Sequence, residues 1–386
     1  MGKTFRIDAV FEDGSFVQSR PFSLMLKPVG GACNLNCAYC YYKGGHQAGR
    51  MDMGQLEALF GNYADSQPAG APLTFIWHGG EPLLAGEEFF RKAVGLQRRM
   101  FSLQGRAEKG PRQVANILQT NATAVTESLA GFLAENNFLC GVSIDGPEAL
   151  HDIPRKTVAG GGSWKQTMHG LRLLQHAGVQ INAMVAVGGH NVAYPGLVYG
   201  FLKDAGLEYI QLLPVAEGPS GWLEGEDWGD FLCGVFDLWR ISDIGKIFVN
   251  YFDNTLALHV GMEPDLCFFC RSCPPCPSAE TGGEVYACDH LSRPLGGNVF
   301  NDPLSVIMSS RQEYSHETEK YLSLSGKCRS CPYLRLCNRD CPVHRTVMFE
   351  NGERISSLCP GYRKYFAYTY DFFSQWAASI VVGQRH

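Results

Sequence analysis

The sequence predicts an α/β protein, a partial (β/α)6 TIM-like barrel followed by a cysteine-rich domain. Short apolar runs alternate with helical patterns about six times between residues 23 and 215, which is typical of a parallel sheet. Only 18% of the 386 residues are charged, below the ~25% of average soluble domains, which excludes a disordered chain or a coiled coil. Thirteen of the 15 cysteines fall into two groups, three at residues 33–40 and ten at residues 267–359.

The individual elements follow from hydrophobic periodicity. The expected strands cover residues 23–27, 74–77, 114–118, 138–144, 181–187 and 209–215. The expected helices cover residues 53–66, 87–102, 125–136, 163–178 and 192–205, with an aromatic helix near 361–381. Residues 1–20 resemble a small hairpin, and the acidic, Trp-bearing stretch 217–230 is expected to be a lid or a peptide contact.

Polar residues follow four of these strands. They are the cysteines at 33–40 and the segments 79–82, 119–121 and 143–146. In barrels of this class, function gathers at the C-terminal ends of the strands. We therefore expect these four segments to share one rim.

Composition also excludes several partners and locations. The net charge of −5 provides no basic field for nucleic acid or for an anionic membrane. No run of 18 or more apolar residues exists, so no membrane span is expected. The N-terminus lacks the apolar core of an export signal, so we expect a cytoplasmic protein whose cysteines are thiolates that hold metal.

Cys33, Cys37 and Cys40 supply three thiolates from one short loop. A four-iron cluster usually takes four thiolates, so three ligands would leave one iron open for a substrate or cofactor. The alternative is a structural zinc site, which is closed and would need a fourth ligand such as His46.

The loop CNLNCAYCYY, which begins at Cys33, resembles the signature of the radical S-adenosylmethionine superfamily. The resemblance implies a [4Fe-4S] cluster that chelates S-adenosylmethionine, whose reductive cleavage yields a radical that removes a substrate hydrogen. It also implies contacts to that cofactor from the GGEP motif, from Ser143 and Asp145 to its ribose and carboxylate, from Arg155 to its carboxylate and from Tyr39 near its adenine. These residues are Tyr39, Gly79, Gly80, Glu81, Ser143, Asp145 and Arg155.

The second cysteine group resembles a SPASM domain, which in this superfamily holds two auxiliary [4Fe-4S] clusters. The resemblance implies one ligand set of Cys267, Cys273, Cys288 and Cys341 and another of Cys328, Cys331, Cys337 and Cys359. Cys270 and Cys276 remain alternatives to Cys267 and Cys273, and two zinc ribbons are the alternative to clusters. The auxiliary clusters are expected to carry electrons, although a structural role stays open.

Within the superfamily, the sequence FIWHGGEP at residues 75–82 and Tyr251, Phe252 and Asp253 resemble the anaerobic sulfatase-maturating enzymes. Those enzymes oxidise a Cys or Ser side chain of a sulfatase to Cα-formylglycine. The resemblance makes Asp253 the base that removes the heteroatom proton, with Tyr42 beside it. Asp253 could instead be an ordinary helix N-cap. His78 departs from the Gln that relatives often carry.

The expected partners are therefore a peptide segment of a client sulfatase and an electron donor such as flavodoxin or ferredoxin. A maturase of ribosomal peptides, forming a thioether or carbon–carbon cross-link, is the rival function because it would share every cluster motif. The predicted domains are the hairpin at 1–20, the barrel at 21–263, the SPASM domain at 264–360 and a C-terminal helix at 361–386.

Overall fold

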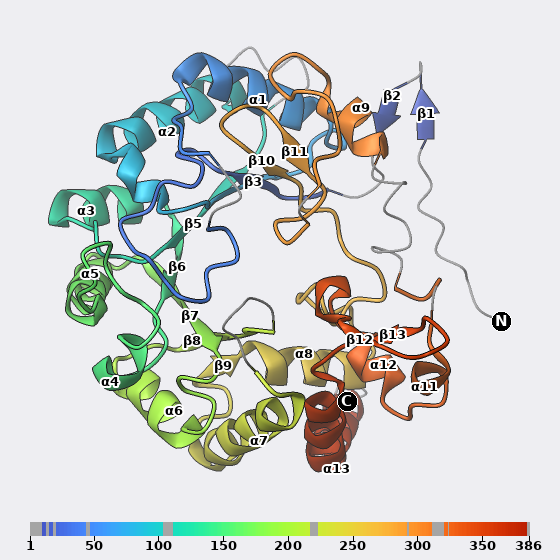
Figure 1. Ribbon diagram of the computed structural model, residues 1–386. Helices are drawn as coiled ribbons and strands as arrows, with labels where there is room; N and C mark the ends of the chain where they lie inside the picture. Colours follow the sequence, from blue (N-terminus) through green and yellow to red (C-terminus); the bar gives the residue numbers. More distant parts are fainter. Residues whose placement is uncertain are drawn as a thin grey trace.

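The computed structural model describes residues 10–12, 15–17, 21–43, 47–102, 111–216, 223–291, 293–310, 320–322 and 324–383. Its framework is a curved nine-stranded sheet with the order β11-β10-β3-β4-β5-β6-β7-β8-β9 (Figure 1). The strands are β3 (Leu24–Leu26), β4 (Leu73–Trp77), β5 (Val114–Thr120), β6 (Leu139–Ser143), β7 (Gln180–Val187), β8 (Tyr209–Pro214), β9 (Phe248–Val249), β10 (Ser278–Ala279) and β11 (Val285–Tyr286). All neighbours pair in parallel except β10 and β11. The predicted parallel α/β fold is confirmed.

Helices cover the outer, convex face of this sheet (Figure 1). They are α1 (Met53–Asp65), α2 (Glu87–Phe101), α3 (Glu127–Glu135), α4 (Glu148–His151), α5 (Trp164–His176), α6 (Pro195–Asp204), α7 (Gly225–Ser242) and α8 (Asn250–His259). Helix α1 starts with a capping box, in which the side chains of Asp52 and Gln55 each accept from the backbone N–H of the other. Its predicted apolar face, including Phe60 and Tyr63, is fully buried.

The expected lid over residues 217–230 is wrong for its last six residues. These residues form the first turns of α7, and Trp228 is fully buried in the core, where it packs edge-on against Tyr251. Residues 217–222 lie outside the described residues. Trp228 therefore anchors a helix, because a large apolar side chain gains more from burial than from a place in a solvated loop.

The C-terminal region holds α9 (Leu304–Ser309), α11 (Gly326–Arg329), α12 (Leu334–Cys337), the hairpin of β12 (Val347–Met348) and β13 (Arg354–Ile355), and the long α13 (Cys359–Gly383). Helix α13 lies along α7, where a Cβ on Gly361 would meet the carbonyl oxygen of Gly225 at 2.0 Å. Because β10 pairs with β3, the sheet continues across the predicted domain boundary at residue 264.

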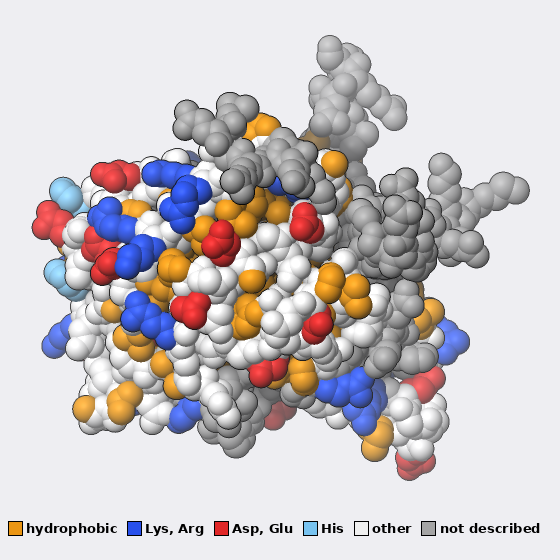
Figure 2. Space-filling model, turned by 90° about the horizontal axis from the view of Figure 1, so that it is seen from above, with side chains coloured by type: hydrophobic (Ala, Val, Ile, Leu, Met, Phe, Trp, Pro, Cys, Tyr) orange, Lys and Arg blue, Asp and Glu red, His pale blue; other side chains and the backbone are white. Residues whose placement is uncertain are grey.

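A two-stranded sheet lies near the start of the chain. Strands β1 (Val10–Glu12) and β2 (Ser15–Val17) pair antiparallel, as in the expected hairpin, and the turn residues 13 and 14 lie outside the described residues. In the part of the chain that the structure describes, no helix is long and apolar enough to cross a membrane. Basic, acidic and apolar side chains are interspersed over the face seen in Figure 2.

Candidate active site

The three cysteines of the first group lie in the loop that follows β3. The electrostatic neighbours of the Cys37 thiol include Cys33 and Cys40, which places the three sulfur atoms near one another. Burial is the largest effect on Cys37 and raises the pKa of its thiol to about 11. A thiol with this pKa keeps its proton at neutral pH, and a metal bound to the sulfur would displace that proton.

The GGEP segment runs close against this loop. The backbone N–H of Gly80 donates to Gly30 O at 2.9 Å, and that of Glu81 donates to Ala32 O at 2.8 Å. A Cβ on Gly80 would lie 2.0 Å from the carbonyl oxygen of Ala32, so only glycine permits this approach. Gly79 is also close to the loop and has a φ of 118°, in the region that favours glycine.

Glu81 joins two strand ends. Its fully buried carboxylate accepts from the backbone N–H of Asn121 at 2.7 Å, from the hydroxyl of Thr120 at 2.8 Å and from the N–H of Leu83 at 3.0 Å. These bonds tie the rim after β4 to the rim after β5. The structure thus places Glu81 as a support of the site.

Asn121 is a rim residue to which the sequence analysis assigned no role. Its side-chain N–H2 donates to Asn34 at 3.0 Å and lies 3.9 Å from the sulfur of Cys33. Its position directly after a strand was the available signal. Asn121 therefore fixes the start of the cysteine loop against the end of β5.

A buried polar group lies on the other side of the loop. The Tyr39 hydroxyl accepts from Arg155 at 2.6 Å and donates to Asp145 at 2.6 Å. The ring of His190, which the sequence analysis did not single out, stacks on Tyr39 with centroids 5.8 Å apart, and its Nε2 is 3.5 Å from Asp145. Although burial disfavours the Asp145 charge, Arg155 and then His190 hold the pKa of its carboxyl below the usual range.

This group fits the amino-acid end of S-adenosylmethionine. Among the described residues, the Nε–H of Arg155 is buried and has no hydrogen-bond partner. A buried, unsatisfied guanidinium donor is costly, and a ligand carboxylate would satisfy it with a charge-assisted bond. Ser143, predicted to contact the same cofactor, accepts from the Gln119 side chain at 3.2 Å at the end of β6. The four predicted rim segments do lie together.

A second buried charge cluster centres on Asp289, which the sequence analysis missed. Asp289 accepts from the ammonium of Lys27 and from the hydroxyl of Tyr41. Lys27 also lies 3.1 Å from Nδ1 of His78, which accepts from the N–H of Gly79 at 2.7 Å. Burial opposes ionisation of Asp289, but the Lys27 ammonium overcomes it and holds the pKa of this carboxyl well below its usual range.

The Asp289 cluster lies between the two cysteine groups. Asp289 directly follows Cys288, and the Tyr41 that binds it directly follows Cys40. Burial, and then Lys27, lower the pKa of His78 to about 3, so its ring is neutral at physiological pH. The only sequence signal for Asp289 was its place next to a predicted ligand.

Tyr42 borders the same cluster. Its hydroxyl donates to Glu280 at 2.5 Å, and the Lys27 ammonium lies 4.5 Å from the centroid of its ring. Tyr42 is buried, with 3% of its surface exposed. The carboxylate that binds Tyr42 is therefore that of Glu280. Lys27 contacts both the Tyr42 ring and Asp289.

The structure places Asp253 in the first turn of α8, the helix that directly follows β9. The helix begins at Asn250 and its N-cap is Val249, so the N-cap alternative for Asp253 is wrong. Burial, and then the Asp265 charge, raise the pKa of Asp253 to about 7. Within the described residues, none of the hydrogen bonds of the rim involves this side chain. The pKa of this carboxyl is raised, as suits a proton acceptor, and its role as the base stays a prediction.

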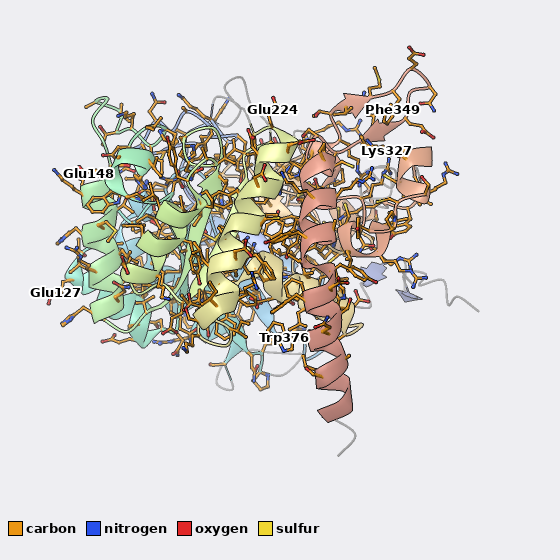
Figure 3. The ribbon with its side chains drawn as sticks, turned by 90° about the horizontal axis from the view of Figure 1, so that it is seen from below. Glu127, Glu148, Glu224, Lys327, Phe349 and Trp376 are labelled. Carbon is orange, nitrogen blue, oxygen red and sulfur yellow. The ribbon has the colours of Figure 1, made fainter. Side chains whose placement is uncertain are left out.

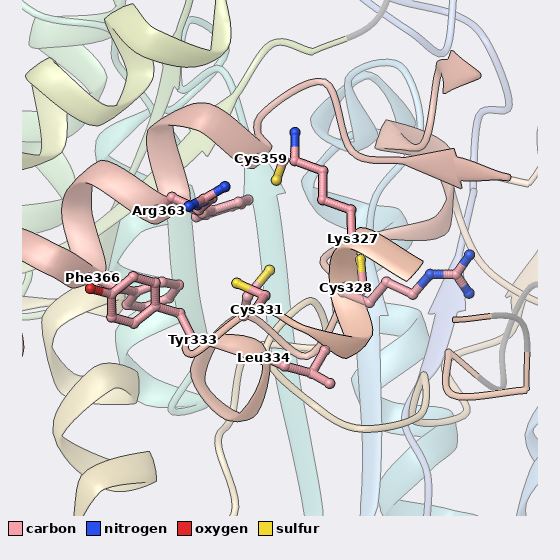
Figure 4. Close-up of a pocket in the computed structure, with 11 residues that line it drawn as sticks. Lys327, Cys328, Cys331, Tyr333, Leu334, Cys359, Arg363 and Phe366 are labelled. Carbon is pink, nitrogen blue, oxygen red and sulfur yellow. The ribbon is translucent and has the colours of Figure 1, made fainter. Parts of the chain in front are cut away.

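One C-terminal quartet of cysteines converges around a single cavity. Cys328 and Cys331 come from α11 and the turn after it, Cys337 ends α12 and Cys359 begins α13. Figure 4 shows the sulfur atoms of Cys328, Cys331 and Cys359 directed toward the same space. The four cysteines among the residues that line this cavity are the ligand set predicted for one auxiliary cluster.

The other quartet also gathers, and the two alternative cysteines both lie near it. Cys267 has Cys288 and Cys273 as neighbours, and Cys341 has Cys267 and Cys288. Cys276 lies near the same group, since Cys288 and Cys267 are among its charged neighbours.

Cys270, the fourth cysteine left open by the sequence, differs from Cys276. Its thiol donates to the carbonyl oxygens of Pro264 and Leu266, at 3.3 and 3.5 Å. In the described part of the chain, no three His, Cys, Asp or Glu side chains converge on one point as around a single ion. A cluster instead takes each thiolate on a different iron, so its ligands ring a wider space.

Known proteins resemble this chain over most of its length. The model of the Radical SAM superfamily matches residues 28–199. A serine-type anaerobic sulfatase-maturating enzyme of Bacteroides thetaiotaomicron is 37% identical over 378 residues, which cover 90% of this chain and 89% of that protein. A cysteine-type anaerobic sulfatase-maturating enzyme of Clostridium perfringens is 28% identical over 371 residues, covering 91% and 96%.

Solved structures give the same result. Native anSMEcpe with bound AdoMet, which is S-adenosylmethionine, matches with a TM-score of 0.84 and 27% identity, over 93% of this chain and 100% of that chain. The same protein with AdoMet and the Cp18Cys peptide matches with a TM-score of 0.83. SuiB of Streptococcus suis, bound to its precursor peptide SuiA, has a TM-score of 0.62 at 13% identity, which shows a shared fold alone.

Proposed function

This chain belongs to the anaerobic sulfatase-maturating enzymes of the radical S-adenosylmethionine superfamily, and we propose that it oxidises a Ser or Cys side chain of a sulfatase to Cα-formylglycine. The observation that carries this proposal is the common rim. There the three-thiol loop, the unsatisfied Arg155 donor and the Asp289 cluster lie together. Such a rim offers a cofactor site and a proton acceptor side by side.

The cofactors would be S-adenosylmethionine and three [4Fe-4S] clusters. Cys33, Cys37 and Cys40 would hold the cluster that binds S-adenosylmethionine, and the two C-terminal quartets would hold the others. When bound, these groups supply the removal of one hydrogen atom from the substrate Cβ and the uptake of one further electron. The chain itself orients the cofactor, with Arg155 at its carboxylate and Ser143 and Asp145 on the same rim.

The remaining chemical task is removal of the proton from the substrate oxygen or sulfur. The sequence proposes Asp253 as the base, and its raised pKa of about 7 supports that role. The geometry favours Asp289, which lies beside Tyr41 and Lys27 in the cluster between the two cysteine groups. We assign the proton to Asp289, with Lys27 holding the carboxylate in place.

The partners follow from this reaction. The client is a peptide segment of a sulfatase, and the electron donor is a small carrier such as flavodoxin or ferredoxin. A reducing compartment such as the cytoplasm suits the 15 cysteines, because thiolates there stay available to metal.

Anaerobic turnover with defined peptides tests the proposal. The reconstituted enzyme is incubated with S-adenosylmethionine, a reductant and sulfatase-type peptides that carry Ser or Cys at the target position. Mass spectrometry is expected to find a Ser peptide that has lost two hydrogen atoms, or a Cys peptide whose SH is replaced by aldehyde oxygen. A cross-linked product that keeps its sulfur would instead support the rival peptide maturase.

A further inference from the structure

The C-terminal region that holds Cys328, Cys331, Cys337 and Cys359 differs in charge from the rest of the protein. Residues 324–383 contain eight Lys and Arg against four Asp and Glu, a net charge of +4, whereas the whole chain carries −5. The remaining 326 residues therefore carry a net charge of −9. A local charge of opposite sign attracts a partner that the rest of the molecule repels.

Two of these cations stand beside the cysteines. Lys327 and Arg363 line the cavity that Cys328, Cys331 and Cys359 surround, and both are exposed (Figure 4). Lys327 immediately precedes a predicted ligand on α11, and Arg363 lies one turn after another on α13. The positive charge is thus placed at the edge of the cluster site.

The hairpin of β12 and β13 carries exposed apolar side chains near Lys327. Val347, Met348 and Phe349 are 42%, 65% and 37% exposed. The hairpin is tied to α11, because the Glu353 carboxylate accepts from the Gly326 N–H at 3.1 and 3.2 Å. Figure 3 shows Phe349 and Lys327 at the same end of the molecule, far from Glu127 and Glu148 on the barrel.

Exposed Met and aromatic side chains beside charged ones are typical of binding surfaces. We name the five residues Lys327, Arg363, Val347, Met348 and Phe349 the cluster-edge surface. We propose that the cluster-edge surface docks an acidic one-electron carrier protein, and this proposal rests on the function proposed above. Small interfaces with charge steering are typical of transient redox partners.

The electron balance of the proposed reaction requires such a partner. Oxidation of the substrate CH2–OH or CH2–SH to CH=O or CH=S releases two electrons and two protons. One electron and one proton leave together as the abstracted hydrogen atom, and the base takes the second proton. The second electron reduces the oxidised flavin or iron–sulfur group of the carrier.

Binding of an acidic flavodoxin to the reconstituted full-length enzyme tests the proposal. Affinity is measured by anaerobic calorimetry at low and high salt, without substrate. The double variant K327E/R363E is expected to raise Kd by about tenfold or more and to flatten the salt dependence, because it reverses the steering charge. The control R172E changes an exposed arginine on α5 and should bind like the wild type.

A second variant separates docking from damage to the cluster, since Lys327 and Arg363 line its cavity. M348S/F349S alters only the β12–β13 hairpin and is expected to weaken flavodoxin binding severalfold, with iron content and the EPR spectrum of the reduced clusters unchanged. Wild-type affinity in both double variants would overturn the proposal. So would loss of sulfatase-peptide binding with flavodoxin binding retained, because the surface would then serve the client. If the proposed function itself is wrong, the wild-type enzyme will form no formylglycine in the sulfatase-type peptides, whatever its affinity for flavodoxin.

Discussion

Several residues of the rim are buried and charged. Without an oppositely charged partner, burial would favour their neutral forms. Asp145 is fully buried, and it is held by Arg155 through Tyr39. Asp289 is held in the same way by Lys27. Removing one partner of such a pair leaves an uncompensated buried charge, which costs about 3–5 kcal/mol. The site is therefore sensitive to single substitutions of its ionic residues.

The two candidate bases make opposite predictions. Asp289→Asn is expected to abolish formylglycine while S-adenosylmethionine still binds, because the amide cannot accept the heteroatom proton. Asp253→Asn is expected to keep product formation, because its neighbours are Asp265 and the C-terminal helix. Peptide mass spectrometry and calorimetric titration with S-adenosylmethionine measure both effects. Turnover by the Asp289 variant, or its loss in the Asp253 variant, would return the role to Asp253.

Asp253 also predicts a dependence of stability on pH. Its pKa is raised from 3.8 to about 7, so the folded state binds this proton more tightly than the unfolded state. The stabilisation is fully present below the unfolded pKa and is lost as pH rises through the folded value. The Tm of the wild type relative to that of Asp253→Asn should therefore fall as the pH rises from about 4 to about 7. Parallel Tm curves for the two proteins would contradict this sign.

Gly80 predicts a steric limit at the rim. Gly80→Ala would place a Cβ 2.0 Å from the Ala32 carbonyl oxygen and force the cysteine loop to move. We expect a loss of about 1–3 kcal/mol of stability and about tenfold weaker binding of S-adenosylmethionine. Gly131→Ala on α3 is the control, since a Cβ there meets nothing within 4 Å and should be neutral or stabilising. Thermal unfolding and calorimetry report both quantities, and equal behaviour of the two variants would argue against a tight rim.

The residues that the sequence predicted and those it missed differ in the range of their contacts. Cys328, Cys331 and Cys337 are ligand candidates because of local spacing, which a sequence displays directly. Asp289 and Lys27 are 262 positions apart, and they meet only because the segment after β11 returns to the edge of β3. No local pattern could mark that pair, and the same holds for His190 on Tyr39.

At the scale of elements, length decided which ones were predictable. The six strands that were predicted, β3 to β8, pair side by side, and the longer ones show clear apolar runs. Strand β9 has two residues, too few to show a period, and it was missed. The start of α7 was misread because its acidic and glycine residues indicate a loop, although tertiary burial of Trp228 overrides that local preference.

The packing of α7 against α13 requires glycine at position 361. A Cβ on Gly361 would meet Gly225 O at 2.0 Å and Gly229 N at 2.7 Å. Gly361→Ala should push α13 away, cost at least about 1–3 kcal/mol and displace Cys359 at its first turn. Iron content should then fall toward about eight per chain from about twelve, with four irons per cluster. Gly200→Ala on α6, with no atom within 4 Å of the new Cβ, should keep both iron and Tm. Full iron in the Gly361 variant would show that α13 tolerates the shift.

At the scale of the whole molecule, the barrel and the cysteine-rich region share their core. Strand β10 extends the barrel sheet through β3, so the edge of the sheet is completed by a segment beyond residue 264. At the opposite edge, Phe236 and Trp239 of α7 pack against Phe373 and Trp376 of α13. The rim is also built from both regions, because Lys27 from the barrel binds Asp289 from the cysteine-rich region.

This shared core predicts that the barrel does not fold alone. A fragment of residues 1–263 would lose β10 and α13, which exposes Phe236, Trp239 and Phe252 and leaves the edge of β3 unpaired. Exposed apolar faces and open strand edges favour aggregation over cooperative folding. We expect the fragment to show no cooperative thermal transition by circular dichroism and no S-adenosylmethionine binding, whereas the full chain shows both. A fragment that unfolds cooperatively and binds the cofactor would mean that the predicted boundary at residue 264 separates two autonomous domains, and that β10 and α13 contribute cover without being required for the fold.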